Sequence, residues 1–156
     1  TITFALALKE RFKKSEYRVY AIDPHDKEHS IESDGLKTWF DDCPFDMSEK
    51  FLENIEKWNV EDHVSYYRCF SQDWNSSRKV KKIAMLFIDG DHRPEQVKKD
   101  LKKFVPMLIK DGLLVMHDRG LVIDLYNEYS EQNNNLFSIP DYEIDHLNRL
   151  IIARKK

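Results

Sequence analysis

The chain of 156 residues has the length of one domain, and a folded chain of this length hides roughly 70% of the surface that it exposes when unfolded. Its 25 basic and 28 acidic residues are mixed along the sequence and give a formal net charge of -3. A dedicated nucleic-acid binder would show a basic patch. We therefore expect a single domain over residues 1–156 that acts on a small-molecule substrate and binds no nucleic acid, and we leave association of identical copies open.

Cysteine content and hydropathy bear on the compartment. Cys43 and Cys69 are the only cysteines, and their spacing is not that of a metal site. Two thiols in a chain this rich in apolar residues indicate a reducing environment, so we expect a cytoplasmic protein. No apolar run approaches the ~20 residues that cross a bilayer, and residues 1–8 lack the features of a signal peptide, which predicts a soluble protein without membrane contact.

The first predicted elements are a helix and a strand. Apolar residues at helical spacing predict a helix over residues 2–14. Residues 17–22 are rich in β-branched and aromatic side chains and predict a buried strand, which ends at Asp23 because Pro24 restricts its geometry. Residues 25–46 show neither period and are predicted to form a long polar loop.

The middle of the chain predicts a helix followed by two strands. We expect Ser48 to cap a helix that extends through Trp58. Residues 64–68 then predict a strand. Residues 83–88 are apolar without alternation, which is typical of a central parallel strand covered on both faces.

The last third continues the alternation of helix and strand. Pro94 lies near the expected start of a helix that Pro106 should bend or end. The remaining predicted elements are a strand at 113–116, a helix at 121–132, and two extended stretches, 136–144 and 147–153, that can pair as an antiparallel hairpin. This order predicts the α/β class, with a mostly parallel sheet and helices on both of its faces.

Three aspartates, Asp23, Asp89 and Asp118, directly follow predicted strands. Open α/β sheets bind their ligands at the carboxyl edge of the sheet, so these side chains are candidates for a functional site. An aspartate after a strand also commonly caps the next helix or closes a turn, and for each aspartate alone both readings stay open. Three of them together favour a function, because each carboxylate costs stability unless it has a partner.

Two of these strand ends also carry histidines. If strands 83–88 and 113–116 are neighbours, about 4.8 Å apart, one small region of the edge gathers a mixed set of acids and imidazoles: Asp89, Asp91, His92, His117 and Asp118. Carboxylate oxygens suit magnesium, and imidazole nitrogens also suit manganese or iron. The sequence therefore predicts a divalent metal site without selecting the ion.

Three motifs resemble a known family. Residues 87–92 (Phe-Ile-Asp-Gly-Asp-His), 97–101 (Val-Lys-Lys-Asp-Leu) and 110–118 (Lys-Asp-Gly-Leu-Leu-Val-Met-His-Asp) are similar to those of class I methyltransferases that depend on S-adenosylmethionine, a group that includes sugar and antibiotic O-methyltransferases. The resemblance implies a Rossmann-like fold and transfer of a methyl group from S-adenosylmethionine to a hydroxyl of a small molecule.

The resemblance also implies the cofactor contacts. Residues 20–24 look like the family's second strand, whose terminal acid, here Asp23, would accept hydrogen bonds from the ribose hydroxyls of S-adenosylmethionine. Phe70 and Ser71 lie where related enzymes place a turn beside the adenine, although the sequence here is Cys-Phe-Ser rather than Gly-Asp-Ser. Asp89 is a further candidate for cofactor binding.

The same resemblance implies the catalytic groups. Asp89 and Asp118 would bind a divalent metal, such as magnesium, that orients the substrate hydroxyls, and Asp91 would be a third ligand or would orient His92. His92 would be the base that accepts the hydroxyl proton. A helix-entry histidine bonded to a nearby carboxylate is the structural alternative for His92.

One feature of the family has no counterpart in the chain. The backbone of its glycine-rich turn, after the first strand, approaches the methionine part of the cofactor closely. The four glycines here are Gly35, Gly90, Gly112 and Gly120, and none forms such a turn, so the first strand is expected to be missing and supplied by an upstream segment. Two alternatives follow: a degenerate fold that acts as a binding module, or an iron-dependent hydroxylase-like protein that uses two histidines and a carboxylate.

Overall fold

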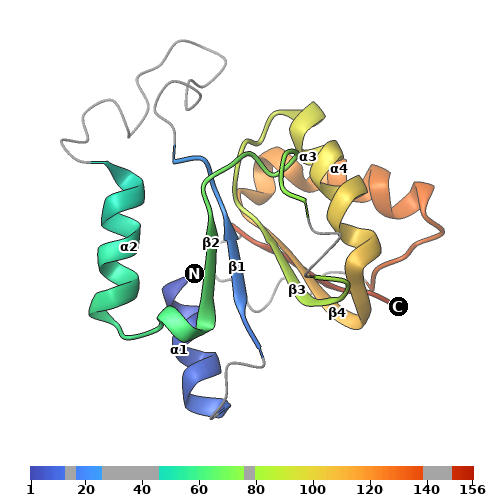
Figure 1. The fold of residues 1–156 in the computed structure, drawn as a ribbon. Helices are drawn as coiled ribbons and strands as arrows, with labels where there is room; N and C mark the ends of the chain where they lie inside the picture. The colour runs from blue at the N-terminus through green and yellow to red at the C-terminus, as the bar shows by residue number, and fades with distance from the viewer. Residues whose placement is uncertain (13–16, 26–45, 76–79, 139–148) are drawn as a thin grey trace. The chain divides into compact units, whose positions relative to one another are not determined.

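The computed structural model describes residues 1–12, 17–25, 46–75, 80–138 and 149–156. They form two compact units, residues 1–74 and 75–156, and Figure 1 traces the elements of each. Each unit combines helices with a small sheet that contains parallel strands. Most of the predicted polar loop at 25–46, including Gly35 and Cys43, lies outside the described residues.

Residues 1–74 contain two helices and a pair of parallel strands. The order is α1 (Ile2–Arg11), β1 (Val19–Ile22), α2 (Met47–Lys57) and β2 (Val64–Tyr67), with a short 3-10 turn before β2. In the parallel pair, Val19 lies opposite Val64 and Ile22 opposite Tyr67. The buried side chains of this unit's core come from both helices, from the connection after α2 and from β2: Ala5, Ile55, Val60 and Val64.

The start of α2 differs from the expectation. Asp46, not Ser48, is the capping residue, and its carboxylate accepts hydrogen bonds from the backbone N–H groups of Ser48 and Glu49. The Ser48 hydroxyl donates to the same oxygen at 2.6 Å. The hydrogen bonds from Ser48, chiefly that of the hydroxyl, lower the pKa of Asp46 to about 2. Both residue types cap helices well, but Asp46 lies outside the first turn, where its carboxylate reaches the free N–H groups.

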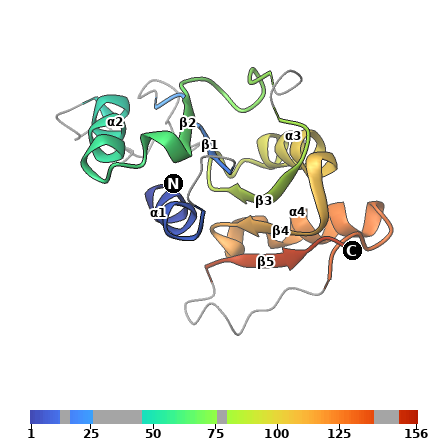
Figure 2. The same ribbon diagram turned by 60° about the horizontal axis from the view of Figure 1, so that its bottom comes forward.

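Residues 75–156 contain a three-stranded sheet and two helices. The strands are β3 (Ile83–Ile88), β4 (Leu108–Met116) and β5 (Ile151–Arg154), in the order β3-β4-β5, as Figure 2 shows. β3 and β4 are parallel, and β5 is antiparallel to β4. The predicted α/β class with a parallel sheet is confirmed.

The helices α3 (Pro94–Phe104) and α4 (Arg119–Gln132) contact each other and share one hydrophobic core with the sheet. A 3-10 turn at Val105–Met107, which contains Pro106, follows α3 directly, as the position of this proline predicts. The core is built from one face of each element: Val97, Leu101, Val122, Leu125, Tyr126, Leu114, Met116, Ile151 and Ala153. This packing fixes the carboxyl ends of β3 and β4 and the start of α4.

Two predictions for these strands need correction. β4 begins at Leu108 rather than at residue 113, and its pairing with β3 shifts register between Ile83 and Met85. β3 is not covered on both faces, because Ile88 is its only buried residue and Phe87 is 40% exposed. Within the described part of the chain β3 pairs only with β4. The apolar composition of β3 therefore predicts more burial than its side chains have.

The C-terminal antiparallel pairing is confirmed for residues 136–138, but their partners are residues 154–156 rather than the predicted stretch 147–153. Phe137 forms an antiparallel bridge with Lys155, and the backbone N–H of Ser138 donates to the carbonyl of Arg154 at 2.8 Å. β5 pairs in addition with β4. Residues 139–148, which contain most of the predicted connection, lie outside the described residues. None of the described helices is long and apolar enough to cross a membrane.

Candidate functional site

The register of β3 and β4 places two predicted site residues side by side. Ile88 lies opposite Met116, and the backbone N–H of His117 donates to the carbonyl of Ile88 at 3.0 Å. Asp89 directly follows Ile88, and His117 directly follows Met116. Nδ1 of His117 lies 2.9 Å from Oδ1 of Asp89. The ladder of the parallel strands therefore brings this acid and this imidazole into contact.

Asp118 contacts both imidazoles of the edge. Its carboxylate lies 3.2 Å from Nδ1 of His117 and 3.7 Å from Nδ1 of His92. Asp118 occupies the N-cap position of α4, yet its side chain makes no capping hydrogen bond, and its backbone has a φ of 52°. Left-handed backbone is unfavourable for a residue with a side chain and is concentrated at functional sites. The helix-capping alternative for Asp118 is therefore not what the structure contains.

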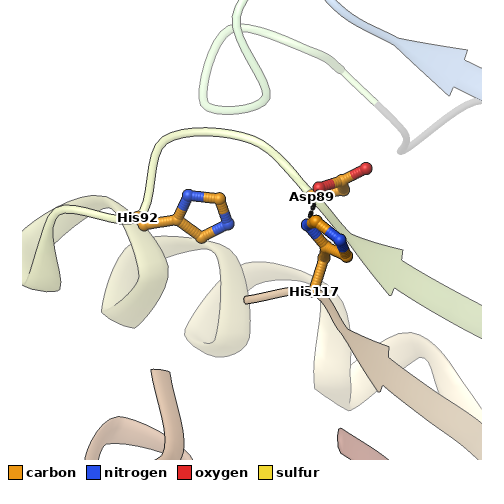
Figure 3. Close-up of side chains that lie close together, drawn as sticks. All are labelled: Asp89, His92 and His117. Carbon is orange, nitrogen blue, oxygen red and sulfur yellow. Dashed lines mark ion pairs between the residues drawn. The ribbon is translucent and has the colours of Figure 1, made fainter. Parts of the chain in front are cut away.

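Asp89, His92 and His117 form a compact group of potential metal ligands. One ligand atom from each lies within 4.8 Å of the others, and Figure 3 shows the side chains converging from the β3–α3 loop and the end of β4. Nε2 of His92 is buried and has no hydrogen-bond partner among the residues that the structure describes. A buried polar atom without a partner is costly, so its place beside two other ligand-type groups makes a metal ion or a bound hydroxyl a candidate partner.

Asp91 has a different partner. Its carboxylate accepts hydrogen bonds from the backbone and the guanidinium of Arg93, with Nε at 2.7 Å. Burial would raise the pKa of Asp91, but the hydrogen bonds from Arg93 outweigh it and the pKa is lowered. Arg93 occupies the N-cap position of α3 without a capping hydrogen bond from its side chain, so this pair lies at the start of the helix, and Asp91 is not part of the compact ligand group.

Asp23 lies at the carboxyl end of β1, in residues 1–74. Its backbone N–H continues the ladder to the carbonyl of Tyr67 at 3.1 Å, and its side chain is 55% exposed. Phe70 and Ser71 lie in the turn that follows the neighbouring strand β2, where Phe70 is 40% exposed and its carbonyl accepts hydrogen bonds from residues 73 and 74. The parallel pairing of β1 and β2 therefore gathers these three predicted cofactor residues at the same end of one sheet.

The sequence placed His117 in the group of acids and imidazoles that predicts a metal site, but gave it no individual role as a ligand or base. Its signal was its position directly after a strand, beside Asp118. His25 and Arg93 were missed, because their roles depend on contacts that no spacing reveals: His25 Nδ1 lies 2.6 Å from the hydroxyl of Tyr66, and Arg93 binds Asp91. An edge that carries both acids and imidazoles can bind a divalent ion or move a proton.

Comparisons with solved structures identify the fold. The O-methyltransferase NovP superposes with a TM-score of 0.78 at 16% identity, over 99% of this chain and 66% of that one. A proposed caffeoyl-CoA O-methyltransferase from Staphylococcus aureus gives 0.58 at 14% identity, over 99% and 83% of the two chains. A proposed methyltransferase from Streptococcus mutans, solved in complex with SAH, gives 0.54 at 14% identity, over 97% and 98%. The predicted Rossmann-like methyltransferase fold is confirmed.

The chain thus spans just under two thirds of the length of NovP. No curated protein matches it in sequence. A family model described as a methyltransferase domain matches residues 1–119, which is most of the chain and includes Asp23, Asp89, His92 and Asp118. With this match and the confirmed fold, the chain belongs to the class I methyltransferase family that depends on S-adenosylmethionine.

Proposed function

We propose that the protein transfers the methyl group of S-adenosylmethionine to a hydroxyl of a small molecule, such as a sugar or a natural product. The observation that carries the proposal is the buried Nε2 of His92, which has no hydrogen-bond partner among the described residues and lies in a group with Asp89, His117 and Asp118. Two structural neighbours are described as O-methyltransferases, and a third was solved with SAH. The net charge of -3 favours a small acceptor over a nucleic acid.

The residues of β1 and the turn after β2 fit the cofactor. Asp23 offers an exposed carboxylate at the end of a parallel strand, where nucleotide-type ligands bind, and two adjacent ribose hydroxyls can donate to it. Phe70 offers a partly exposed ring and Ser71 a hydroxyl in the adjacent turn. These three residues would bind the adenosine part, and S-adenosylmethionine supplies an electrophilic methyl group on a sulfonium.

His92 would act as the base. As the substrate oxygen forms its bond to the methyl carbon, the carbon–sulfur bond breaks, the sulfur keeps the electron pair as a thioether, and the hydroxyl proton passes to Nε2 of His92. The carboxylate of Asp118 lies 3.7 Å from the other ring nitrogen and would stabilise the resulting imidazolium. General base catalysis of this kind contributes about 10²–10⁴-fold to a rate.

Metal assistance is part of the proposal. Asp89 and Asp118, two of the three acids assigned from the sequence, lie in contact with His117, which would complete or orient the ligand set. Asp91, the third assigned acid, is bound to Arg93. It would hold the conformation of the β3–α3 loop that carries His92 rather than bind the ion. A divalent ion such as magnesium held here would orient and acidify the substrate hydroxyl.

Two measurements test this function. Isothermal titration calorimetry with S-adenosylhomocysteine should detect binding, and a panel of sugar and phenolic acceptors should include a methylated product. His92→Gln should lower the methylation rate about 10²–10⁴-fold while leaving S-adenosylhomocysteine affinity unchanged. Asp124→Asn, a change of an exposed acid on α4, is the matched control and should alter neither. Absence of S-adenosylhomocysteine binding would refute the proposal and favour the binding-module alternative.

A second candidate rests on the ligand group itself. Asp89, His92 and His117 have the two-histidine, one-carboxylate composition of iron oxygenases. In that function His92 would be a ligand rather than a base. Anaerobic titration with Fe²⁺ separates the two candidates: tight binding that His92→Gln abolishes, without S-adenosylhomocysteine binding, supports the oxygenase. Metal binding that survives His92→Gln supports the methyltransferase assignment.

A further inference from the structure

The short turn after β1 has an unusual conformation. The backbone N–H of His25 donates to Oδ1 of Asp23 at 2.7 Å, which closes the turn over Pro24. His25 has a φ of 45°, in the left-handed region that favours glycine. Backbone of this kind persists only where surrounding contacts hold it in place. The contacts that hold His25 therefore also hold the carboxylate of Asp23.

The imidazole of His25 is anchored by two aromatic side chains. Its Nδ1 lies 2.6 Å from the hydroxyl of Tyr66 on β2, and its ring centroid lies 5.3 Å from that of Tyr66 and 5.4 Å from that of Phe51 on α2. The rings of Phe51 and Tyr66 lie 4.9 Å apart, so the three form one cluster. The His25 side chain is only 13% exposed, which makes this contact a firm anchor for the turn.

β2 and the residue that follows it also fix the rest of the turn. The hydroxyl of Tyr66 donates to the backbone carbonyl of Asp23 at 3.3 Å, and Nε of Arg68 donates to the carbonyl of Pro24 at 3.2 Å. All three residues of the turn are therefore bonded to β2 or its end. Nε2 of His25 lies 3.8 Å from Oδ2 of Asp23, on the ring edge opposite the Tyr66 contact. The carboxylate stays 55% exposed and open to a ligand.

We propose that His25, anchored by Tyr66 and Phe51, is a positioning residue that holds the Asp23 carboxylate ready for the ribose hydroxyls of the methyl donor. The inference rests on the proposed function. A carboxylate on an unsupported turn would sample several orientations, and binding would have to select one. The turn makes this selection in advance, because one oxygen already accepts the His25 N–H and the backbone on both sides is fixed.

The test compares two ligands: S-adenosylhomocysteine and its analogue that lacks both the 2′- and 3′-hydroxyls. Calorimetry measures their dissociation constants for the wild type, for His25→Ala, for Asp23→Ala and for the double variant. We expect His25→Ala to weaken S-adenosylhomocysteine binding about tenfold, since residues in contact couple at this level. We expect little effect of His25→Ala on the dideoxy analogue, and little further effect in the Asp23→Ala background.

Two further variants separate positioning from general packing. Tyr66→Phe keeps the ring contacts but removes the hydroxyl, and it should weaken S-adenosylhomocysteine binding. Its matched control is Tyr67→Phe, because the ring of Tyr67 contacts Tyr20 and Trp74 instead. His25→Asn, which tolerates a positive φ, should recover part of the loss seen in His25→Ala.

The outcomes are distinct. Equal losses for both ligands in His25→Ala would show a packing role and overturn the inference, as would no loss for either. S-adenosylhomocysteine binding in the wild type with no coupling between His25 and Asp23 overturns the inference but leaves the proposed function standing. Absence of S-adenosylhomocysteine binding in the wild type overturns both. Circular dichroism of each variant establishes that it is folded.

Discussion

Gly112 offers a sharp test of how β4 sets the site. A Cβ atom at this position would lie 2.9 Å from the carbonyl oxygen of Ile109, 2.9 Å from Cγ of Leu108 and 3.0 Å from the carbonyl oxygen of Ala84. Ordinary contacts begin near 3.4 Å, and two of the three atoms are backbone oxygens. Gly112→Ala must therefore push β4 away from β3 or distort the irregular pairing that precedes the site.

The magnitude follows from two opposing effects. Overpacking of this kind costs about 1–3 kcal/mol. Loss of conformational freedom in the unfolded chain returns about 0.4–1 kcal/mol for a glycine-to-alanine change. The net loss of unfolding free energy should be about 1–2 kcal/mol. With a urea dependence of about 1–3 kcal/mol per molar, the unfolding midpoint should fall by roughly 0.5–1 M.

The assay is urea unfolding followed by far-ultraviolet circular dichroism. Gly120→Ala is the control, because its added Cβ would meet no atom of the described residues within 4 Å beyond its own helix turn, and the residue is in the first turn of α4. This control should be neutral or stabilising by up to about 1 kcal/mol. If the two variants have the same midpoint, the close approach at Gly112 does not constrain β4, and the register argument for the Asp89–His117 contact loses its support.

Three further changes probe the framework of the two units. Asp46→Ala removes the cap of α2. The folded protein lowers the pKa of Asp46 from its ordinary value of 3.8 to about 2, so the carboxylate stabilises the fold above pH 3.8 and this stabilisation is lost as the pH falls through about 2. Denaturant titrations at each pH should therefore show the stabilities of wild type and variant converging near pH 2. Nζ of Lys155 donates to the carbonyls of Val105 and Leu108 at 3.1 and 2.6 Å. Lys155→Met removes this donor and should lower the free energy of unfolding in urea by about 1–3 kcal/mol. A smaller loss would mean that water replaces the ammonium. Leu114→Ala opens a cavity at a fully buried position and should cost about 2–5 kcal/mol, against less than about 0.5 kcal/mol for a change at the exposed Asp124.

Much of the fold could be predicted because its signals are local. The bounds of α3 follow from Pro94 and Pro106, the strand at 19–22 follows from β-branched and aromatic residues, and the strand at 83–88 follows from an apolar run. Errors occurred where two residues competed for one role, as Asp46 and Ser48 did at the start of α2. They also occurred where burial depends on distant partners, as it does for the exposed Phe87 of β3.

The candidate site likewise has features that local sequence predicts and features that depend on distant partners. The sequence by itself determined which residues follow the strands, and so it identified Asp23, Asp89 and Asp118 and the family to which their motifs belong. Only the tertiary structure decided the contacts: strand register brings His117 into contact with Asp89, and Asp91 pairs with Arg93 instead of joining the ligand group. The physical reason is that chain position fixes where a residue lies along an element, whereas side-chain partners depend on the packing and register of elements distant in sequence.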